Sequence, residues 1–438
     1  MEKTLVEKWD GVLSKTNAPV VSEDKKVAVA RMLENQAMWN EANRTALNSL
    51  TEAAPENNAG AGMNSADTGN IKGYDPILIS MLRRAAPQMI AFDVCGVQPM
   101  NQPTGLIFAM KARYGDGDTN LTDDVEALFD EAVTDFSGKG THAGGDAAVL
   151  AQSTPGTYTS GTALTTAEGE ALGNGTTWGT MGMTIDKVAV SAGTRGLRAD
   201  YSHELQTDLR NVHGLDAEKE LGNILSTEML AEVNREVIRD LYSISELGAA
   251  TTTTAGTFDL DTDSNGRWAV EKFKGMIFQI EREANQIAIN TRRGKGNILI
   301  CSQDIASALS LAGLLDHNPA LEAVTKLNVD VSSGTFAGML NGRIKVYVDP
   351  YLTGGSGADF AVVGYKGATQ YDAGYFYAPY VPLEMFKAQG ENDFQPRIAF
   401  KTRYGKVTNP YANRSGTPGA ITANVNKYYR KFRVTNIL

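Results

Sequence analysis

Two long segments place apolar residues at helical spacing. In residues 200–243, and again in residues 267–292, large apolar side chains mostly recur at steps of three or four, which aligns them on one face of a helix. A glycine inside a helix costs about 1 kcal/mol relative to alanine. Gly214 and Gly222 therefore predict a bend in the first of these helices.

Shorter segments alternate with the two-residue period of a strand. Residues 104–113 put Leu106, Phe108 and Met110 on one side of an extended chain, and residues 183–190 have a matching pattern. Further strands are expected at 298–302, 343–349, 359–365, 394–407 and 427–437. Small helices and glycine-rich turns separate these runs, so helices and strands are expected to mix in the second half of the chain.

The first part of the chain has a weaker pattern. Residues 22–51 predict a helix with Ser22 as its N-cap, but its apolar stripe is thin and the helix would be marginal alone. Residues 53–73 are small, polar and rich in Gly and Asn, so they bury too little apolar surface to offset their ordering entropy. Residues 76–94 predict a helix interrupted near Pro87. The segment before the polar linker therefore looks detachable.

Length and composition narrow the class of protein. A chain of 438 residues is too long for one hydrophobic core, which predicts two or more domains. With 42% hydrophobic and 21% charged residues, the composition is that of a soluble globular protein. The two cysteines, Cys95 and Cys301, lie in apolar runs and are expected to be buried and reduced. No apolar run reaches the roughly 18 residues of a membrane helix, and no signal peptide is recognisable, which predicts a cytoplasmic protein without a membrane partner.

The net charge of −10 is unevenly distributed. Residues 115–180 hold eleven acids and one base, Lys139, whereas residues 395–438 hold nine bases and no acid. Solvated faces of one subunit are the simpler interpretation; complementary surfaces between copies, or a face turned to nucleic acid, remain open. The basic interface candidates are Arg397, Lys401, Arg403, Lys427, Arg430, Lys431 and Arg433.

Catalytic motifs are missing from the sequence. It contains no HExxH, Walker, GxSxG or GxGxxG pattern. The four histidines, His142, His203, His213 and His317, are isolated from one another. The sequence therefore favours a protein that is not an enzyme and that needs no cofactor.

One segment resembles a calcium loop. Asp261, Asp263 and Asn265 alternate and Gly266 follows, but the twelfth position, which should be a bidentate Glu, is Lys272. A cation at a ligand position argues against calcium. An Asx-rich turn before a helix is the favoured interpretation, with the three side chains a weak metal candidate.

Two other motifs have structural explanations. The basic, glycine-rich segment 292–297 predicts a helix C-terminus capped by Gly294, with cations at the negative end of the helix dipole. A cluster of aromatic residues could stack bases, but its prolines favour a packed sheet edge. The cluster comprises Tyr371, Tyr375, Phe376, Tyr377 and Tyr380.

Four collinear blocks carry a family resemblance. Residues 90–110, 200–237, 360–383 and 394–405 resemble the major capsid proteins of T-even-like tailed bacteriophages. The resemblance implies an α+β, HK97-like tailed-phage capsid fold with an extended loop, a peripheral domain with a long spine helix, and an axial domain. The insert in the extended loop looks shorter than is usual in that family.

The resemblance also implies a division of the chain. The expected parts are a cleavable, scaffold-associated helical propeptide (1–52), a flexible N-arm (53–75), the N-arm helix and first loop strand (76–114), the acidic insertion (115–180), the return strand and peripheral domain with the spine helix (181–295), the axial domain (296–383) and C-terminal strands (384–438).

In this family a prohead protease cuts after Glu in a Leu/Ile-x-Glu motif. Leu50, Thr51 and Glu52, followed by Ala53, fit that motif. The segments 5–7 and 244–246 also match it. Only Glu52 lies between a helical segment and a polar linker, and proteolysis needs an extended, accessible backbone.

The function implied by the resemblance is assembly. Copies would form hexameric capsomers of a virion shell around double-stranded DNA, built in the host bacterial cytoplasm. Implied partners are pentamers of a vertex protein, an internal scaffold, the prohead protease, a portal and decoration proteins. The alternatives are the pentameric vertex paralogue, a nanocompartment shell protein of the same fold, and, from another class, a calcium-binding or hydrolytic enzyme.

Overall fold

The computed structural model describes most of the chain in two compact units. Its described residues are 2–13, 23–50, 89–115, 126–128, 132–143, 159–174, 178–264, 266, 268–313, 315–316, 335–352, 359–369, 371–390, 395–412 and 419–437. One unit comprises Met1–Gly105 and Ala189–Leu438, and the other comprises Leu106–Val188. The polar linker 53–73 and residues 76–88 of the helix expected over 76–94 lie outside the described residues, whereas residues 91–94 are helical.

The larger unit contains a sheet of long strands. Its order is β1 (Gly96–Val97), β12 (Tyr375–Gln389), β13 (Pro396–Thr408) and β4 (Gly193–Asp200). β1 is parallel to β12, and the other pairs are antiparallel. The strand expected at 394–407 is confirmed as β13. Tyr375, Phe376, Tyr377 and Tyr380 of the aromatic cluster lie on β12, which has neighbours on both sides, so the prediction of a sheet edge is wrong.

A second sheet in this unit holds the remaining strands. Its order is β5 (Ser245–Leu247), β14 (Asn426–Thr435), β11 (Phe360–Gly364), β7 (Ile298–Cys301), β10 (Ile344–Val348), β9 (Thr335–Leu340) and β8 (Leu315–Asp316), with β6 (Thr257–Asp259) beside β14. In β7, Ile298 and Ile300 join one core cluster, whereas Leu299 and Cys301 join another. Both faces of the strand are buried, which explains its unbroken apolar run.

The long helical pattern is divided at one of its two glycines. α7 (His203–Asp208) and the π-helical turn η3 (Leu209–His213) end at Gly214, whose φ is 66°, and α8 (Ala217–Ile244) starts afresh with Asp216 as N-cap. A left-handed conformation is cheap only for glycine, so the chain breaks there. Gly222 is buried inside the uninterrupted α8. The predicted bend is therefore confirmed at Gly214 and wrong at Gly222.

The second predicted helix is α9 (Ala269–Thr291), and its end differs from the prediction. Arg292 adopts the left-handed C-cap conformation, with φ 54°. Gly294 is not the cap; a Cβ there would lie 2.7 Å from Cε2 of Tyr365. The glycine thus allows a close approach of the chain to an aromatic ring, which a sequence pattern alone does not reveal.

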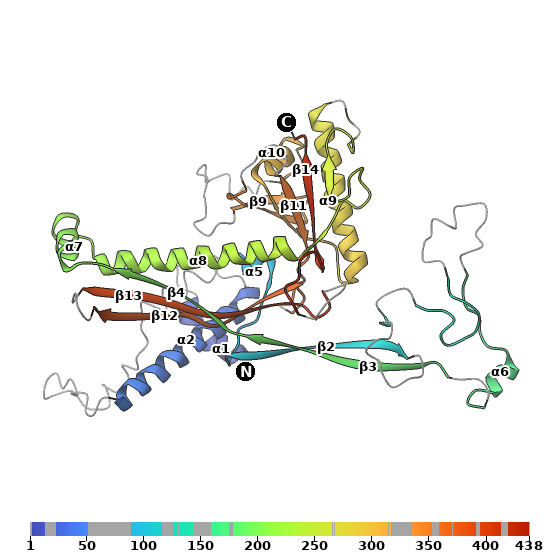
Figure 1. Ribbon diagram of the computed structural model, residues 1–438, viewed down its shortest axis with the longest axis horizontal. Coiled ribbons are helices and arrows are strands. Elements are labelled where there is room, and N and C mark those ends of the chain that lie inside the picture. Colours follow the sequence, from blue (N-terminus) through green and yellow to red (C-terminus); the bar gives the residue numbers. More distant parts are fainter. Residues whose placement is uncertain are drawn as a thin grey trace. The chain divides into compact units, whose positions relative to one another are not determined.

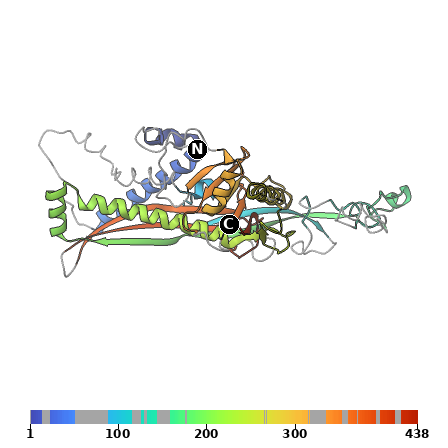
Figure 2. The ribbon, with the colours of Figure 1, turned by 90° about the horizontal axis from the view of Figure 1, so that it is seen from above.

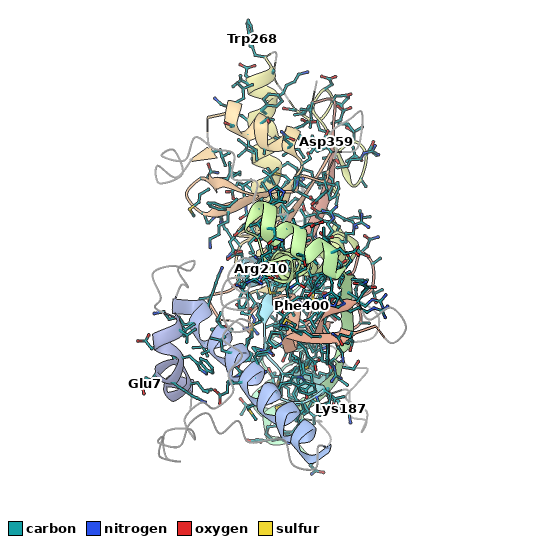
Figure 3. All side chains as sticks on the ribbon, turned by 90° about the vertical axis from the view of Figure 1, so that its left-hand side faces the viewer. Glu7, Lys187, Arg210, Trp268, Asp359 and Phe400 are labelled. Carbon is teal, nitrogen blue, oxygen red and sulfur yellow. The ribbon has the colours of Figure 1, made fainter. Side chains whose placement is uncertain are left out.

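Helices cover both faces of the second sheet. α9 and α10 (Gln303–Leu311) pack on one face, whereas α8 and the short α5 (Ala91–Val94) share the cluster on the other. α8 also runs alongside β13 and β4 (Figures 1 and 2). Figure 3 shows Phe400 within the packed side chains of β13 and Trp268 projecting outward at the start of α9. Within the described residues, no helix is long and apolar enough to cross a membrane.

Both cysteines are buried, as predicted. Burial raises the pKa of the Cys95 thiol to about 12, and it raises the pKa of the Cys301 thiol to about 12 as well. The thiolate is the reactive form of cysteine. Both residues therefore act as small apolar side chains in the core.

The N-terminal helices are packed more firmly than their sequence predicts. α2 (Glu23–Leu50) confirms the helix expected over 22–51, and α1 (Glu2–Leu13) is a helix that the sequence analysis did not predict. Trp9, Leu13 and Leu33 lie in the same core cluster as residues of α8 and β14. Ala28, Val29 and Ala30 are all buried in succession. Small side chains let α2 approach its neighbours closely, so packing against the rest of the unit stabilises a helix that the sequence predicts to be marginal alone.

The smaller unit is built on a two-stranded ribbon. β2 (Thr104–Gly115) pairs with β3 (Thr180–Ser191), which confirms both strands expected there. Parts of the acidic insertion are described beyond the ribbon, including α6 (Thr166–Glu170), whose N-cap Thr165 forms a capping box with Glu168. Lys139, the one base of the insertion, forms an ion pair with Glu168 at 2.8 Å.

Candidate assembly surfaces

The ribbon of β2 and β3 has one polar and one apolar side. Lys111 forms an ion pair with Asp186 at 3.0 Å, and Arg113 donates to Thr184 Oγ1 at 3.2 Å, which places these four side chains together. Because side chains alternate along a strand, the intervening residues face the opposite side. The large apolar residues of that side are Leu106, Phe108, Met110, Met181, Met183 and Ile185, called the arm face below.

The arm face is exposed in the single chain. Its six large side chains are between 55% and 61% exposed. Single exposed apolar residues are ordinary on protein surfaces, whereas a contiguous apolar patch marks an interaction site. The apolar side chains of this face can be removed from water only when another surface lies against the ribbon.

A charged joint connects α8 with the long-stranded sheet. Glu232, Glu236 and Asp240 follow at four-residue spacing, so they form a row on one face of the helix. Arg195 of β4 contacts Glu236 at 2.7 Å and Glu232 at 3.1 Å. Lys406 of β13 contacts Glu236 at 2.6 Å and Asp240 at 2.7 Å. The row thus fixes the helix to two strands.

Tyrosine hydroxyls complete this joint. Tyr404 accepts from Arg195 Nε at 2.6 Å and also donates to Glu236, while Tyr375 donates to Asp240 at 2.7 Å. Burial alone would raise the pKa of Glu236, but hydrogen bonds from Lys406, Tyr404 and Arg195 lower it overall. Burial likewise opposes the charge of Lys406, yet its carboxylate partners raise its pKa. Both groups therefore stay charged in the folded protein.

Replacing Glu236 by glutamine is expected to lower the free energy of unfolding by about 2 kcal/mol at neutral pH, because charge-assisted hydrogen bonds are lost. The folded-state pKa of Glu236 is depressed from 4.5, so its stabilisation is fully present above that pH and declines as the pH falls below it. Thermal unfolding of the wild type and the variant from about pH 7 to about pH 3 measures this, and the difference in stability between them should shrink in acid.

Glu232→Gln, which loses one longer contact at an exposed carboxylate, is the matched control. Equal destabilisation by both variants would contradict the role of Glu236.

An adjacent side of α8 is fixed to the second sheet. Asp349, which follows β10 and is 1% exposed, accepts from Arg235 at 2.5 Å and from Tyr242 at 2.8 Å. Its other carboxylate oxygen accepts from the Tyr351 backbone at 3.0 Å. α8 is therefore held to both sheets by ionic contacts.

Several of the basic C-terminal residues face acids or rings of their own chain. Arg397 lies 3.8 Å from Asp200, and Lys401 lies 3.8 Å from Glu384. The Arg403 guanidinium lies over the Tyr380 ring at 5.2 Å. These acids and rings lie outside residues 395–438, so the sequence of that stretch shows an excess of positive charge without its partners.

Arg430 is wrong as an interface candidate. It is 7% exposed and contacts Glu283 at 2.6 Å and Glu246 at 3.0 Å. Its neighbour Lys431 donates to the Tyr242 carbonyl at 2.7 Å, and burial lowers the pKa of that lysine. Lys427 also has a partner within the chain, whereas Arg433 is exposed on β14.

The calcium-like segment is occupied by contacts within the protein. Lys272 forms an ion pair with Asp261. Asp263 accepts from the backbone of Thr253 at 2.9 Å and of Asp259 at 3.0 Å, and Asn265 lies outside the described residues. The described part of the chain holds no group of three His, Cys, Asp or Glu placed to bind a metal. These contacts favour the Asx-rich turn.

The aromatic cluster is mostly buried. Tyr375, Phe376 and Tyr377 are at most 3% exposed, and the Tyr377 ring lies 5.2 Å from that of Tyr404. Tyr371 is 67% exposed. Rings packed into a sheet leave no face for bases, so the structure favours packing over nucleic-acid stacking.

A basic cavity lies where α2 meets the second sheet. It has a volume of about 510 Å³, and its lining includes Lys25, Asp93, Arg343, Lys345 and Lys366. Lys25 pairs with Asp93 at 2.6 Å, and Arg343 pairs with Glu281 at 2.6 Å. Burial lowers the pKa of Lys366, which donates to the Phe92 carbonyl. The charged lining is mainly positive, and Lys25, Arg343 and Lys366 each have a partner within the protein.

Comparison with known proteins gives one consistent result. The family described as "Major capsid protein Gp23" matches residues 71–434. The major capsid protein of Salmonella phage ViI is 41% identical over 439 residues, covering 97% of this chain and 96% of the relative. The major capsid protein of Enterobacteria phage T4 is 34% identical over 518 residues, covering 99% of this chain and 98% of the relative. The capsid vertex protein of Enterobacteria phage T4 is 26% identical over 244 residues, covering 52% of each chain.

These matches confirm the resemblance to major capsid proteins of T-even-like phages. The α+β class is confirmed, and the structure contains the parts expected of an HK97-like capsid fold: an extended two-stranded loop, a long helix and a sheet domain. The relatives bear the names of structural proteins, in agreement with the prediction that the chain is not an enzyme. The chain belongs to the Gp23 family of major capsid proteins and is a structural protein of the phage capsid.

Proposed function

We propose that this chain forms hexameric capsomers that tile a shell around double-stranded DNA. The observation that carries the proposal is the arm face, a contiguous apolar surface on a ribbon that projects side chains to solvent on that side. Lying across a neighbouring copy would bury it. At roughly 25 cal/mol per Å² of apolar area, modest contacts repeated around a ring are enough to hold a closed assembly.

Electron microscopy of the purified chain tests this proposal, with scaffold co-expressed where the chain alone does not assemble. Rings of six copies or closed shells are expected. A chain that stays monodisperse and single-copy under every co-expression condition would contradict it. Such assembly would take place in the host bacterial cytoplasm, with vertex pentamers, a portal and decoration proteins as further partners.

The pentameric vertex paralogue is the nearest alternative. Similarity to major capsid proteins extends over nearly the whole chain, whereas similarity to the vertex protein covers about half of it and is weaker. Copy number per particle distinguishes the two, because vertices require far fewer copies than faces. A nanocompartment shell protein of the same fold is separated from both by the absence of a cleaved N-terminal segment.

Maturation by cleavage after Glu52 is part of the proposal. With the prohead protease present, particles should contain a chain that begins at Ala53, and Glu52→Gln should keep the chain at full length because the residue preceding the cut is changed. Intact-protein mass spectrometry of particles measures this. Glu7→Gln alters a second Leu-x-Glu match and should leave processing normal. Cleavage at Ala53 in the Glu52 variant would refute the assignment.

The charge distribution fits a shell with two different faces. An acidic insertion turned outward would keep particles apart and keep its eleven acids away from packaged DNA. Because Arg397, Lys401, Lys406 and Arg430 meet acids of their own chain, contact with DNA would be weak and without sequence preference. Arg433 remains the best-placed candidate for a contact outside the subunit.

A further inference from the structure

α2 presents three polar side chains to a single strand of the sheet. Asn35, Gln36 and Trp39 occupy adjacent positions on the helix, and all three bond to the segment 380–384 of β12. Gln36 Oε1 accepts from the Leu383 backbone at 3.1 Å, and Trp39 Nε1 donates to the Glu384 carboxylate at 3.0 Å. Asn35 Nδ2 donates to the Tyr380 carbonyl at 3.5 Å.

The bonded segment is the irregular part of its ladder. Five residue steps along β12, from Pro379 to Glu384, correspond to three along β13, from Tyr404 to Lys401. β12 therefore carries two extra residues there, and bulged residues lose their ladder partners. Leu383 lies within this stretch, and its N–H is satisfied by Gln36 instead. α2 thus supplies a hydrogen bond that the neighbouring strand does not.

The same helix is anchored along its length. Gln36, Val29 and Leu33 are fully buried, and Asn35 also donates to the Met100 carbonyl at 2.8 Å. The Trp39 ring meets that of Tyr380 edge-on, with 6.0 Å between centroids. Apolar side chains around these hydrogen bonds exclude water from them, and such an arrangement slows dissociation of the two bonded segments.

We propose that Asn35, Gln36 and Trp39 form a clasp that keeps α1 and α2 bound to the rest of the subunit after the chain is cut between α2 and Met89. The clasp holds segment 380–384 in its bulged register for as long as it is closed. Cleavage alone then does not release the N-terminal helices; a second event must open the clasp. The biological use of this step rests on the cleavage proposed above.

The clasp explains why a segment destined for removal would be built into the core. While it is closed, the irregular part of β12 keeps its backbone partners. When it opens, the Leu383 N–H and the Tyr380 carbonyl of this strand lose their partners in α2, which favours a rearrangement of the strand. Removal of α1 and α2 would thereby change the hydrogen bonding of β12 in the long-stranded sheet.

The test uses the full chain with a recognition sequence for an unrelated site-specific protease inserted within residues 53–75. After cutting, size-exclusion chromatography follows the fragment that carries α1 and α2. We expect it to remain with the body in the wild type, and to dissociate about 100-fold faster in the double variant Q36A/W39A. Met38→Ala, on the same helix at a side chain 63% exposed, is the matched control and should retain the fragment.

Hydrogen exchange provides a readout that does not depend on the variants. In the cut wild-type chain the Leu383 amide should stay as protected as in the uncut chain, and should lose protection when the fragment is removed. Immediate release of the wild-type fragment, or an unchanged Leu383 exchange rate after release, would overturn the clasp. Because the inserted site replaces natural processing, a wrong assignment of Glu52 would leave this result standing.

Discussion

Replacing Arg430 by methionine is expected to lower the free energy of unfolding by about 3–5 kcal/mol, because it leaves a buried carboxylate without its cation. Glu283 is 3% exposed and contacts Arg430 Nε at 2.6 Å. The same carboxylate accepts from Gln279 at 2.7 Å and from the Ala249 backbone at 2.8 Å. The variant removes the positive charge while these bonds hold the negative charge in place. Chemical denaturation of the unassembled subunit measures the loss.

Arg433→Met is the matched control, because Arg433 lies on the same strand and is exposed. Its effect should stay within about 0.5 kcal/mol. A double variant that also changes Glu283 to glutamine should recover part of the stability lost in Arg430→Met, since it removes the stranded charge. Equal stability of the two arginine variants would show that the Arg430 ion pairs do not stabilise the fold.

Placing carboxylates in the arm face is expected to prevent assembly without unfolding the subunit. Phe108 and Ile185 are 61% and 60% exposed, so aspartate at both positions costs the isolated chain little. In an assembled shell the same positions would be covered, and burying an unpaired charge costs several kcal/mol. The double variant should lower the assembled fraction about 100-fold or more, as measured by sedimentation and electron microscopy.

Phe278→Asp is the control for adding a charge at an exposed aromatic residue. Phe278 is 69% exposed on α9 and does not belong to the arm face. It should assemble as the wild type does. Normal assembly of the Phe108 and Ile185 double variant, with the thermal stability of all three proteins unchanged, would remove the arm face from the assembly mechanism.

Local periodicity was enough to place about half of the regular elements, although β12, β4 and α1 were not predicted. α2, α9, β2, β3 and β13 lie close to the expected positions, because the side that a residue faces depends on its immediate neighbours in the chain. Family membership could also be inferred from the sequence, since four collinear blocks preserve residue order. The break at Gly214 was predictable for the same reason: a left-handed residue at a helix end is a local event.

The pairing of charges and the packing of α2 depend on contacts between residues that are distant in the sequence. Arg430 lies 147 residues from Glu283, so its charge looked available in the sequence and is neutralised in the fold. The contact between Gln36 and Leu383 spans 347 residues, and it turns a helix with a thin apolar stripe into part of the core.

The sequence by itself determined where many of the helices and strands form, which family the chain resembles, and which face of the ribbon is apolar. Only the tertiary structure decided which charges are satisfied, that β12 lies inside a sheet, and that α2 is tightly held. The physical reason is that periodicity reports the geometry of consecutive residues, whereas pairing and burial depend on which distant segments the folded chain brings into contact.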